Sequence, residues 1–125
     1  MNLVDSSGWL EYFGEGPNAD FFARPIRDVK RLVVPTLSIF EVFKRVAQQR
    51  GEGEALQAIA VMQQATVVDL SATLALDSAR VSLDEHLPMA DSIMLATARA
   101  CGATLWTKDA HFKDIEGVQY IEKEK

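Results

Sequence analysis

Hydrophobic and polar positions follow two alternating periods along this chain, and the alternation predicts strands separated by helices. Short apolar runs typical of buried strands occur at residues 2–5, 31–34, 66–70, 103–107 and 118–121. Apolar residues at helical spacing occur between them, at residues 6–13, 18–24, 36–50, 54–65, 71–81 and 89–101. Among the expected boundaries, Pro25 ends the second helix and Pro35 closes the second strand.

Strands that alternate with helices predict an α/β fold, here a three-layer α/β/α sandwich around a mainly parallel five-stranded sheet. The chain has 125 residues, of which 48% are hydrophobic, and this composition predicts one domain over residues 1–125. In such folds ligands bind beyond the carboxyl ends of the strands, near the point where the strand order reverses. We therefore expect the functional residues to follow the strands directly.

The overall charge changes this picture only slightly. Thirteen Lys and Arg residues against 18 Asp and Glu residues give a net charge of −5, whereas nucleic-acid binders are more often basic. Cations bound by some of the acids would reverse the local field and weaken that objection. The single cysteine, Cys101, excludes an intrachain disulfide and a multi-cysteine metal site. With no secretion signal and no apolar run long enough to cross a bilayer, we expect a cytoplasmic protein without a membrane partner.

Four carboxylates recur at the ends of the predicted elements. Asp5 closes the first strand, and Asp109 follows the fourth. Glu41 lies one turn into the third helix, and Asp91 lies in the first turn of the last helix. Converging acids repel one another unless a cation joins them, and carboxylate oxygens suit Mg²⁺ or Mn²⁺. The pattern predicts a metal-dependent site that acts on phosphate.

Two hydroxyl residues stand beside these acids. Ser6 and Thr107 could bind a metal-bound water or a phosphate oxygen, or they could serve as a helix cap and a solvated strand end. Ser7 is an equally good cap for the first helix.

Each acid also has an ordinary local interpretation. Asp5 could cap the first helix, and Glu41 could form a capping box with Ser38. Asp91 could complement a helix dipole, and Asp109 could be a surface turn residue.

The motifs around these residues resemble those of PIN-domain ribonucleases, and more closely those of VapC-type toxins of toxin–antitoxin pairs. The four motifs lie in order at residues 3–7, 34–42, 87–92 and 105–112, so the resemblance covers nearly the whole chain. It implies a sheet of order 3-2-1-4-5 and an Mg²⁺- or Mn²⁺-dependent endoribonuclease that hydrolyses RNA phosphodiester bonds. It further implies a homodimer and a cognate antitoxin that occupies the cleft.

The resemblance also implies roles for single residues. Asp5 and Asp91 would be direct metal ligands, while Glu41 and Asp109 would bind a second ion or position water. Ser6 and Thr107, introduced above, would be supporting polar groups.

Two other functions stay open at this point. One is a non-catalytic PIN-like module that only binds a partner or nucleic acid. The other is a phospho-accepting receiver domain, for which Asp69 ends the third strand where a phosphoacceptor would lie. The receiver prediction lacks an acidic pair beside the first strand and a Lys-Pro pair after a late strand.

Histidines and basic groups complete the candidates. His86 and His111 fit surface or turn roles better than metal binding or general-base catalysis. Two basic groups could either bind an RNA backbone or form solvated surfaces; they comprise Arg24, Arg27, Lys30 and Arg31, and Lys44, Arg45 and Arg50.

Overall fold

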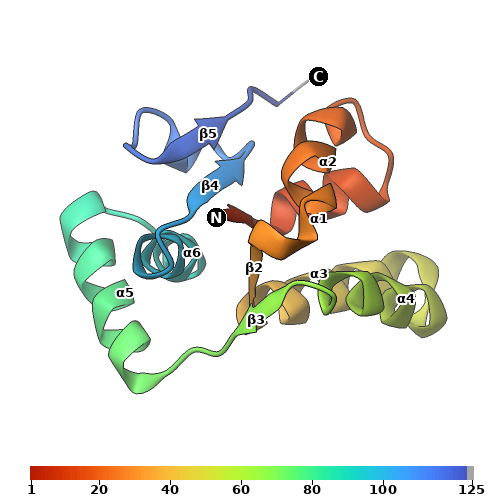
Figure 1. Ribbon diagram of the computed structural model, residues 1–125, viewed down its shortest axis with the longest axis horizontal. Helices are drawn as coiled ribbons and strands as arrows, with labels where there is room; N and C mark the ends of the chain where they lie inside the picture. The colour runs from red at the N-terminus through yellow and green to blue at the C-terminus, as the bar shows by residue number, and fades with distance from the viewer. Residues whose placement is uncertain (124–125) are drawn as a thin grey trace.

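The computed structural model describes residues 1–123 as alternating strands and helices (Figure 1). The strands are β1 (Asn2–Val4), β2 (Leu32–Pro35), β3 (Thr66–Val68), β4 (Thr104–Thr107) and β5 (Val118–Tyr120). The α helices are α1 (Ser6–Phe13), α2 (Ala19–Arg27), α3 (Thr36–Arg50), α4 (Glu52–Met62), α5 (Ala72–Glu85) and α6 (Met89–Ala100). Two 3₁₀ turns, η1 (Val29–Arg31) and η2 (Ala110–Phe112), precede β2 and follow β4. Over these 123 residues, every helix is too short or too polar to span a membrane.

All five strands are parallel, in the order β3-β2-β1-β4-β5, which confirms the predicted fold. The central strand β1 pairs with β2 on one side and with β4 on the other. The chain builds the sheet outward from β1 to β3 and then returns to the opposite side of β1 with β4. The strand order therefore reverses between β1 and β4, and this is where a parallel sheet leaves a crevice for ligands.

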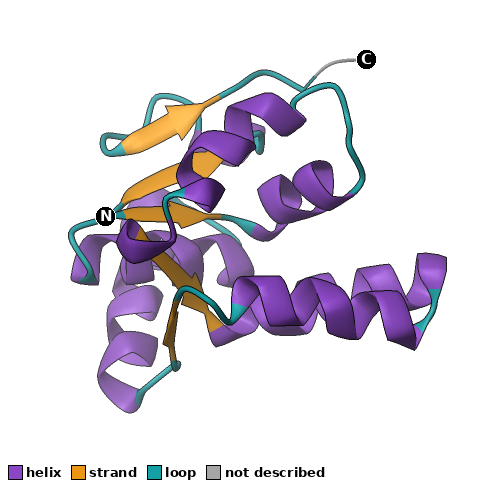
Figure 2. Ribbon diagram, turned by 45° about the vertical axis from the view of Figure 1, so that its right-hand side comes forward, coloured by secondary structure: helices purple, strands orange, loops and turns teal. Residues whose placement is uncertain are grey.

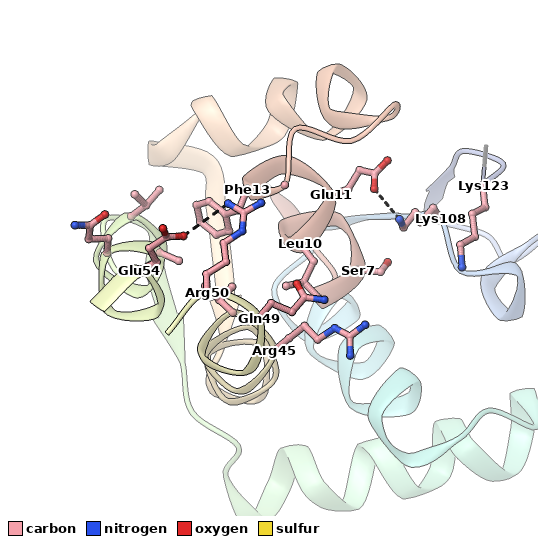
Figure 3. Close-up of a pocket in the computed structure, with 15 residues that line it drawn as sticks. Ser7, Leu10, Glu11, Phe13, Arg45, Gln49, Arg50, Glu54, Lys108 and Lys123 are labelled. Carbon is pink, nitrogen blue, oxygen red and sulfur yellow. Dashed lines mark hydrogen bonds and ion pairs between the residues drawn. The ribbon is translucent and has the colours of Figure 1, made fainter. Parts of the chain in front are cut away.

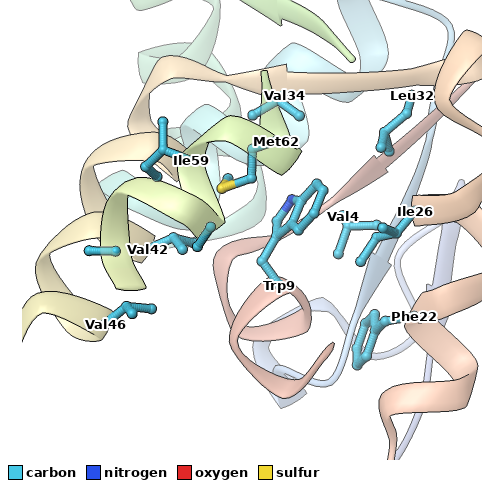
Figure 4. Close-up of a cluster of buried hydrophobic side chains, with 12 residues drawn as sticks. Val4, Trp9, Phe22, Ile26, Leu32, Val34, Val42, Val46, Ile59 and Met62 are labelled. Carbon is cyan, nitrogen blue, oxygen red and sulfur yellow. The ribbon is translucent and has the colours of Figure 1, made fainter. Parts of the chain in front are cut away.

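Helices cover both faces of the sheet, with α5 and α6 on one face and the four earlier helices on the other (Figures 1 and 2). Successive side chains of β1 point to opposite faces. Val4 packs in the cluster that contains Trp9, Val42 and Met62 (Figure 4). Leu3 packs in the cluster formed with α5 and α6. Two buried layers thus hold β1 rigidly, together with the residue that follows it.

Three helices differ from their predicted ranges by more than one residue, and one of them, α5, runs on to Glu85 instead of ending at residue 81. Helix α2 continues through Pro25 to Arg27, although Pro25 was expected to end it. A proline in the last turn forfeits one backbone hydrogen bond, but both Pro25 and Ile26 are buried here, and that apolar burial offsets the loss. Helix α4 begins at Glu52 and ends at Met62, so it starts and stops earlier than the predicted range 54–65.

Gly8 allows α1 to approach the sheet and α2 closely. A Cβ atom at this position would lie 2.6 Å from Val4 Cγ1 and 2.6 Å from Phe22 Cδ1, and both of these side chains are fully buried. We expect Gly8→Ala to lower the free energy of unfolding by about 1–3 kcal/mol, because a packed core must move to admit the methyl group. Urea unfolding measures this difference.

The matched control is Gly53→Ala in the first turn of α4, where a Cβ atom would meet nothing within 4 Å. Alanine favours a helix over glycine, so this variant should gain up to about 1 kcal/mol. A Gly8→Ala protein as stable as the parent would contradict the close approach of α1.

Candidate metal centre

Asp5 is held at the carboxyl end of β1 by three hydrogen bonds. Its Oδ1 accepts from the Gly8 N–H at 3.0 Å and from Ser7 Oγ at 2.7 Å, and its Oδ2 accepts from Thr107 Oγ1 at 2.5 Å. Asp5 is therefore the N-cap of α1, which confirms the cap interpretation of this acid. The prediction that Ser6 or Ser7 caps the helix is wrong, because both serines lie inside it.

Burial makes the charge on Asp5 costly. Only 5% of the residue is exposed, and this desolvation raises the pKa of Asp5 to about 6, against the opposing hydrogen bonds from Thr107, Ser7 and Gly8. The nearby charge of Asp109 raises the pKa of Asp5 further. A carboxylate in this position gains from any cation placed beside it.

Thr107 connects the ends of β1 and β4. Its fully buried hydroxyl donates to Asp5 and accepts the Asp109 backbone N–H at 2.9 Å. Asp109 in turn caps η2, since its Oδ1 accepts the His111 backbone N–H at 2.9 Å. The two acids that follow neighbouring strands are thus linked through one threonine.

Asp91 reaches the same place from the first turn of α6. Its Oδ2 lies 2.7 Å from His111 Nδ1, which also lies 3.3 Å from Asp109 Oδ1. Desolvation, followed by the charge of Asp109, raises the pKa of Asp91, while the hydrogen bond from His111 opposes that rise. Conversely, the hydrogen bond to Asp91 and the charges of both acids raise the pKa of the exposed His111.

The sequence did not predict that His111 is part of the site. It does lie in an exposed turn, as expected, but its imidazole bridges Asp91 and Asp109. The available signal was its spacing two residues after an acid that ends a strand, since such an acid can cap a turn and fix the next side chains. His86 lies apart from this cluster, at the left-handed C-cap of α5.

Glu41 joins the centre through Ser6, whose Oγ donates to Glu41 Oε1 at 2.7 Å. The predicted capping box is absent, because Pro35 is the N-cap of α3 and Ser38 is buried inside the helix. The Ser38 hydroxyl instead contacts Met94 Sδ at 3.5 Å. Glu41 is therefore tied to the residue next to Asp5 rather than to its own helix end.

The donor atoms present fit a divalent cation. One ligand atom from each of Asp91, Asp109 and His111 lies within 4.8 Å of the other two. Asp5 is linked to Asp109 by the two hydrogen bonds of Thr107. Glu41 accepts a hydrogen bond from Ser6, the residue that follows Asp5. The carboxylate oxygens of this set suit Mg²⁺ or Mn²⁺, and the His111 imidazole beside them is hydrogen-bonded to Asp91.

Asp69, the phosphoacceptor of the receiver hypothesis, lies elsewhere. It follows the edge strand β3, is exposed, and makes no side-chain hydrogen bond or ion pair within residues 1–123. The strand order also differs from the 2-1-3-4-5 order of receiver domains. Both observations remove the basis of that hypothesis.

Comparisons with known proteins agree with this architecture. The family model described as the PIN domain matches residues 3–118. A toxin–antitoxin complex from Klebsiella pneumoniae superposes with a TM-score of 0.81 at 20% sequence identity, covering 95% of this chain and 96% of the other. The DNA-bound VapBC of Salmonella typhimurium gives 0.73 at 12% identity, covering 98% of each chain.

A third solved structure is the sarcin–ricin loop cleaving toxin VapC20 of Mycobacterium tuberculosis. It superposes with a TM-score of 0.67 at 16% identity, covering 83% of this chain and 85% of that toxin. The comparison with curated proteins gave no match. At these identities the superpositions establish the fold alone. Because the family model matches residues 3–118, the chain belongs to the PIN domain family.

Proposed function

We propose that this protein is a metal-dependent endoribonuclease of the VapC type, acting as the toxin of a toxin–antitoxin pair. The supporting observation is that Asp91, from α6, meets Asp109 and His111 beyond the carboxyl end of β4, with Asp5 linked to Asp109 through Thr107 and Glu41 bonded to Ser6. Burial, with a smaller contribution from the charge of Asp109, raises the pKa values of Asp5 and Asp91, so a cation bound here would lower the cost of ionising them. The toxin and toxin–antitoxin structures that share the fold favour the same function.

The chain's own residues would hold and orient the reacting groups. Asp5, Asp91 and Asp109 would hold the cation, and Glu41, oriented by Ser6, would position water or a second ion. A bound Mg²⁺ or Mn²⁺ would supply water activation and stabilise negative charge on the phosphate. His111 would fix the orientation of the Asp91 carboxylate, as the partners of metal ligands commonly do.

Cleavage of a mixed pool of structured RNAs by the purified protein tests this proposal. We expect cleavage with Mg²⁺ or Mn²⁺ and none with EDTA. Cleavage that is unaffected by EDTA would overturn the metal dependence. Intact metal binding without cleavage of any RNA in the pool would favour the non-catalytic binding module instead.

Thr107→Val should reduce metal-dependent cleavage by roughly 10- to 100-fold, the range observed when a residue that orients a metal ligand is lost. Valine has nearly the same shape but neither donates to Asp5 nor accepts the Asp109 N–H. Thr107→Ser keeps the hydroxyl and should retain most activity. Initial cleavage rates at saturating Mn²⁺ compare the two variants, and equal rates would show that the hydroxyl has no role.

The remaining parts of the proposal concern assembly. We propose a single PIN domain over residues 1–125 that acts in the cytoplasm as a homodimer, with a cognate antitoxin covering the cleft. Light scattering should then report about twice the chain mass of 13.8 kDa. Monomer at all accessible concentrations would refute the homodimer.

A further inference from the structure

A groove of about 750 Å³ lies between α1, α3 and α4, next to the acidic centre (Figure 3). It begins at Ser7, which lines it and whose hydroxyl donates to Asp5. Lys108, another lining residue, stands in the chain between Thr107 and Asp109 of the centre. The groove therefore adjoins the centre through Ser7 and Lys108.

The groove is basic although the chain as a whole carries a charge of −5. Four cationic side chains line it against two anionic ones; the cations are Arg45, Arg50, Lys108 and Lys123, and the anions are Glu11 and Glu54. Arg50 is paired with Glu54 at 3.8 Å, at the end formed by α3 and α4. Arg45 and Lys123 are exposed and form no ion pair with any residue among 1–123 (Figure 3).

Lys108 differs from the other cations because it is mostly buried and held in place. Its side chain is 18% exposed, and its Nζ donates to Glu11 Oε2 at 2.8 Å. Glu11 is itself fixed, since its Oε1 accepts the Asn18 N–H at 2.9 Å. The hydrogen bond from Lys108, with a smaller contribution from the charge of Lys123, keeps the pKa of Glu11 below its ordinary value. Both lysines therefore lie close to the same carboxylate.

We propose that Lys108, together with Arg45 and Lys123, binds the backbone phosphates of a single-stranded RNA segment next to the cleaved bond. Glu11 holds Lys108 in position until a phosphate joins Glu11 as a second partner of Lys108 or takes its place. This inference rests on the proposed nuclease function, because it assigns the substrate's path away from the acidic centre.

Charge favours RNA over a protein segment at this end of the groove. Proteins that bind single strands without sequence preference track the backbone with a positively charged groove, and an aromatic side chain often stacks on a base. Phe13 lines the same groove and is half-buried beside the cations. An apolar protein segment would leave Arg45 and Lys123 without anionic partners, whereas a phosphate backbone supplies one at every nucleotide.

Fluorescence anisotropy with a labelled single-stranded RNA of mixed sequence, in EDTA and at several KCl concentrations, tests the inference without cleavage. Lys108→Met, Arg45→Ala and Lys123→Ala should each weaken binding by roughly threefold to tenfold. Each should also reduce the slope of log Kd against log salt by about 0.7, the contribution of one phosphate contact in a single strand.

The direction in which RNA affinity changes separates a binding role for Lys108 from a structural one. Glu11→Gln keeps an acceptor for Asn18 but frees the charge of Lys108, so it should hold or raise RNA affinity while Lys108→Met lowers it. A purely structural ion pair would instead make the two variants alike, and that result overturns the proposal.

Matched controls come from a second ion pair, Arg80–Asp77 at 2.9 Å on α5, which covers the other face of the sheet. Arg80→Ala and Asp77→Asn should leave both the affinity and the salt slope unchanged. The inference is overturned if the groove variants bind RNA with the same affinity as the parent, or if the parent binds no RNA at low salt. A protein segment would then be the better candidate for the groove.

The two proposals can fail separately. Metal-dependent cleavage that is lost in Asp5→Asn but unchanged in the groove variants would keep the nuclease and remove the groove from its substrate path. RNA binding that depends on the groove, without cleavage in any metal, would keep the groove and refute the nuclease.

Discussion

Replacement of Asp5 by asparagine is expected to reduce metal-dependent RNA cleavage by at least about 100-fold. Loss of a residue that only orients a metal ligand costs about 10- to 100-fold, so loss of a proposed direct ligand should cost no less. Asparagine has the same shape and can still accept from Gly8 and Ser7, but it brings no negative charge to the cation. Initial rates with Mn²⁺, compared at equal protein concentration, give the ratio.

Asp69→Asn is the control for this substitution. It removes a carboxylate that also follows a strand but is exposed and lies on the edge of the sheet, apart from the centre. Its cleavage rate should equal that of the parent. If Asp5→Asn retained more than about a tenth of the activity, Asp5 would not be a ligand.

The same Asp5→Asn substitution is expected to stabilise the metal-free protein at neutral pH, by about 1–3 kcal/mol. The folded pKa of about 6 stands above the ordinary value of 3.8, so the folded protein binds the Asp5 proton more tightly than the unfolded chain does. Ionised Asp5 therefore costs stability as the pH rises through this range, and the full cost is present above pH 6. About two pH units correspond to about 3 kcal/mol, which is the upper limit.

Urea unfolding in EDTA at pH 4 and at pH 7.5 measures this effect. The advantage of Asp5→Asn over the parent should be nearly absent at pH 4, where the parent carboxyl is protonated in the folded state, and largest at pH 7.5. An advantage that does not change with pH would show that burial of the charge is not its cause. Added Mn²⁺ should narrow the gap, because it stabilises only the parent.

The opposite directions of these two effects are informative together. A variant that is more stable but inactive cannot have lost activity through misfolding. This combination is expected where a protein keeps a buried charge for function at the expense of stability.

Much of the fold follows from local sequence pattern. The short apolar run of Leu3 and Val4 is a strand signal that needs no tertiary information, and the structure buries one of these residues on each face of the sheet. The positions of Asp5 and Asp109 just beyond β1 and β4 were also predictable, because the pattern marks both strands clearly. The end of α2 was not predictable, since the buried contacts of Pro25 and Ile26 outweigh the local tendency of proline to stop a helix.

Side-chain partners across the sheet were beyond local pattern. Ser38 and Glu41 have the spacing of a capping box, yet each bonds to a distant residue, Met94 and Ser6, once the helices pack. The Lys108–Glu11 pair joins residues 97 positions apart. In these cases tertiary packing decides which of several available donors and acceptors meet.

If the clustered carboxylates form a divalent-cation site, the protein binds Mn²⁺ in solution, and a titration followed by electron paramagnetic resonance of the free ion measures that binding. We expect saturable binding by the parent and by Asp69→Asn, and a large loss of affinity in Asp91→Asn. Binding by Asp91→Asn that equals the parent, or no binding by the parent at millimolar Mn²⁺, would contradict the claim.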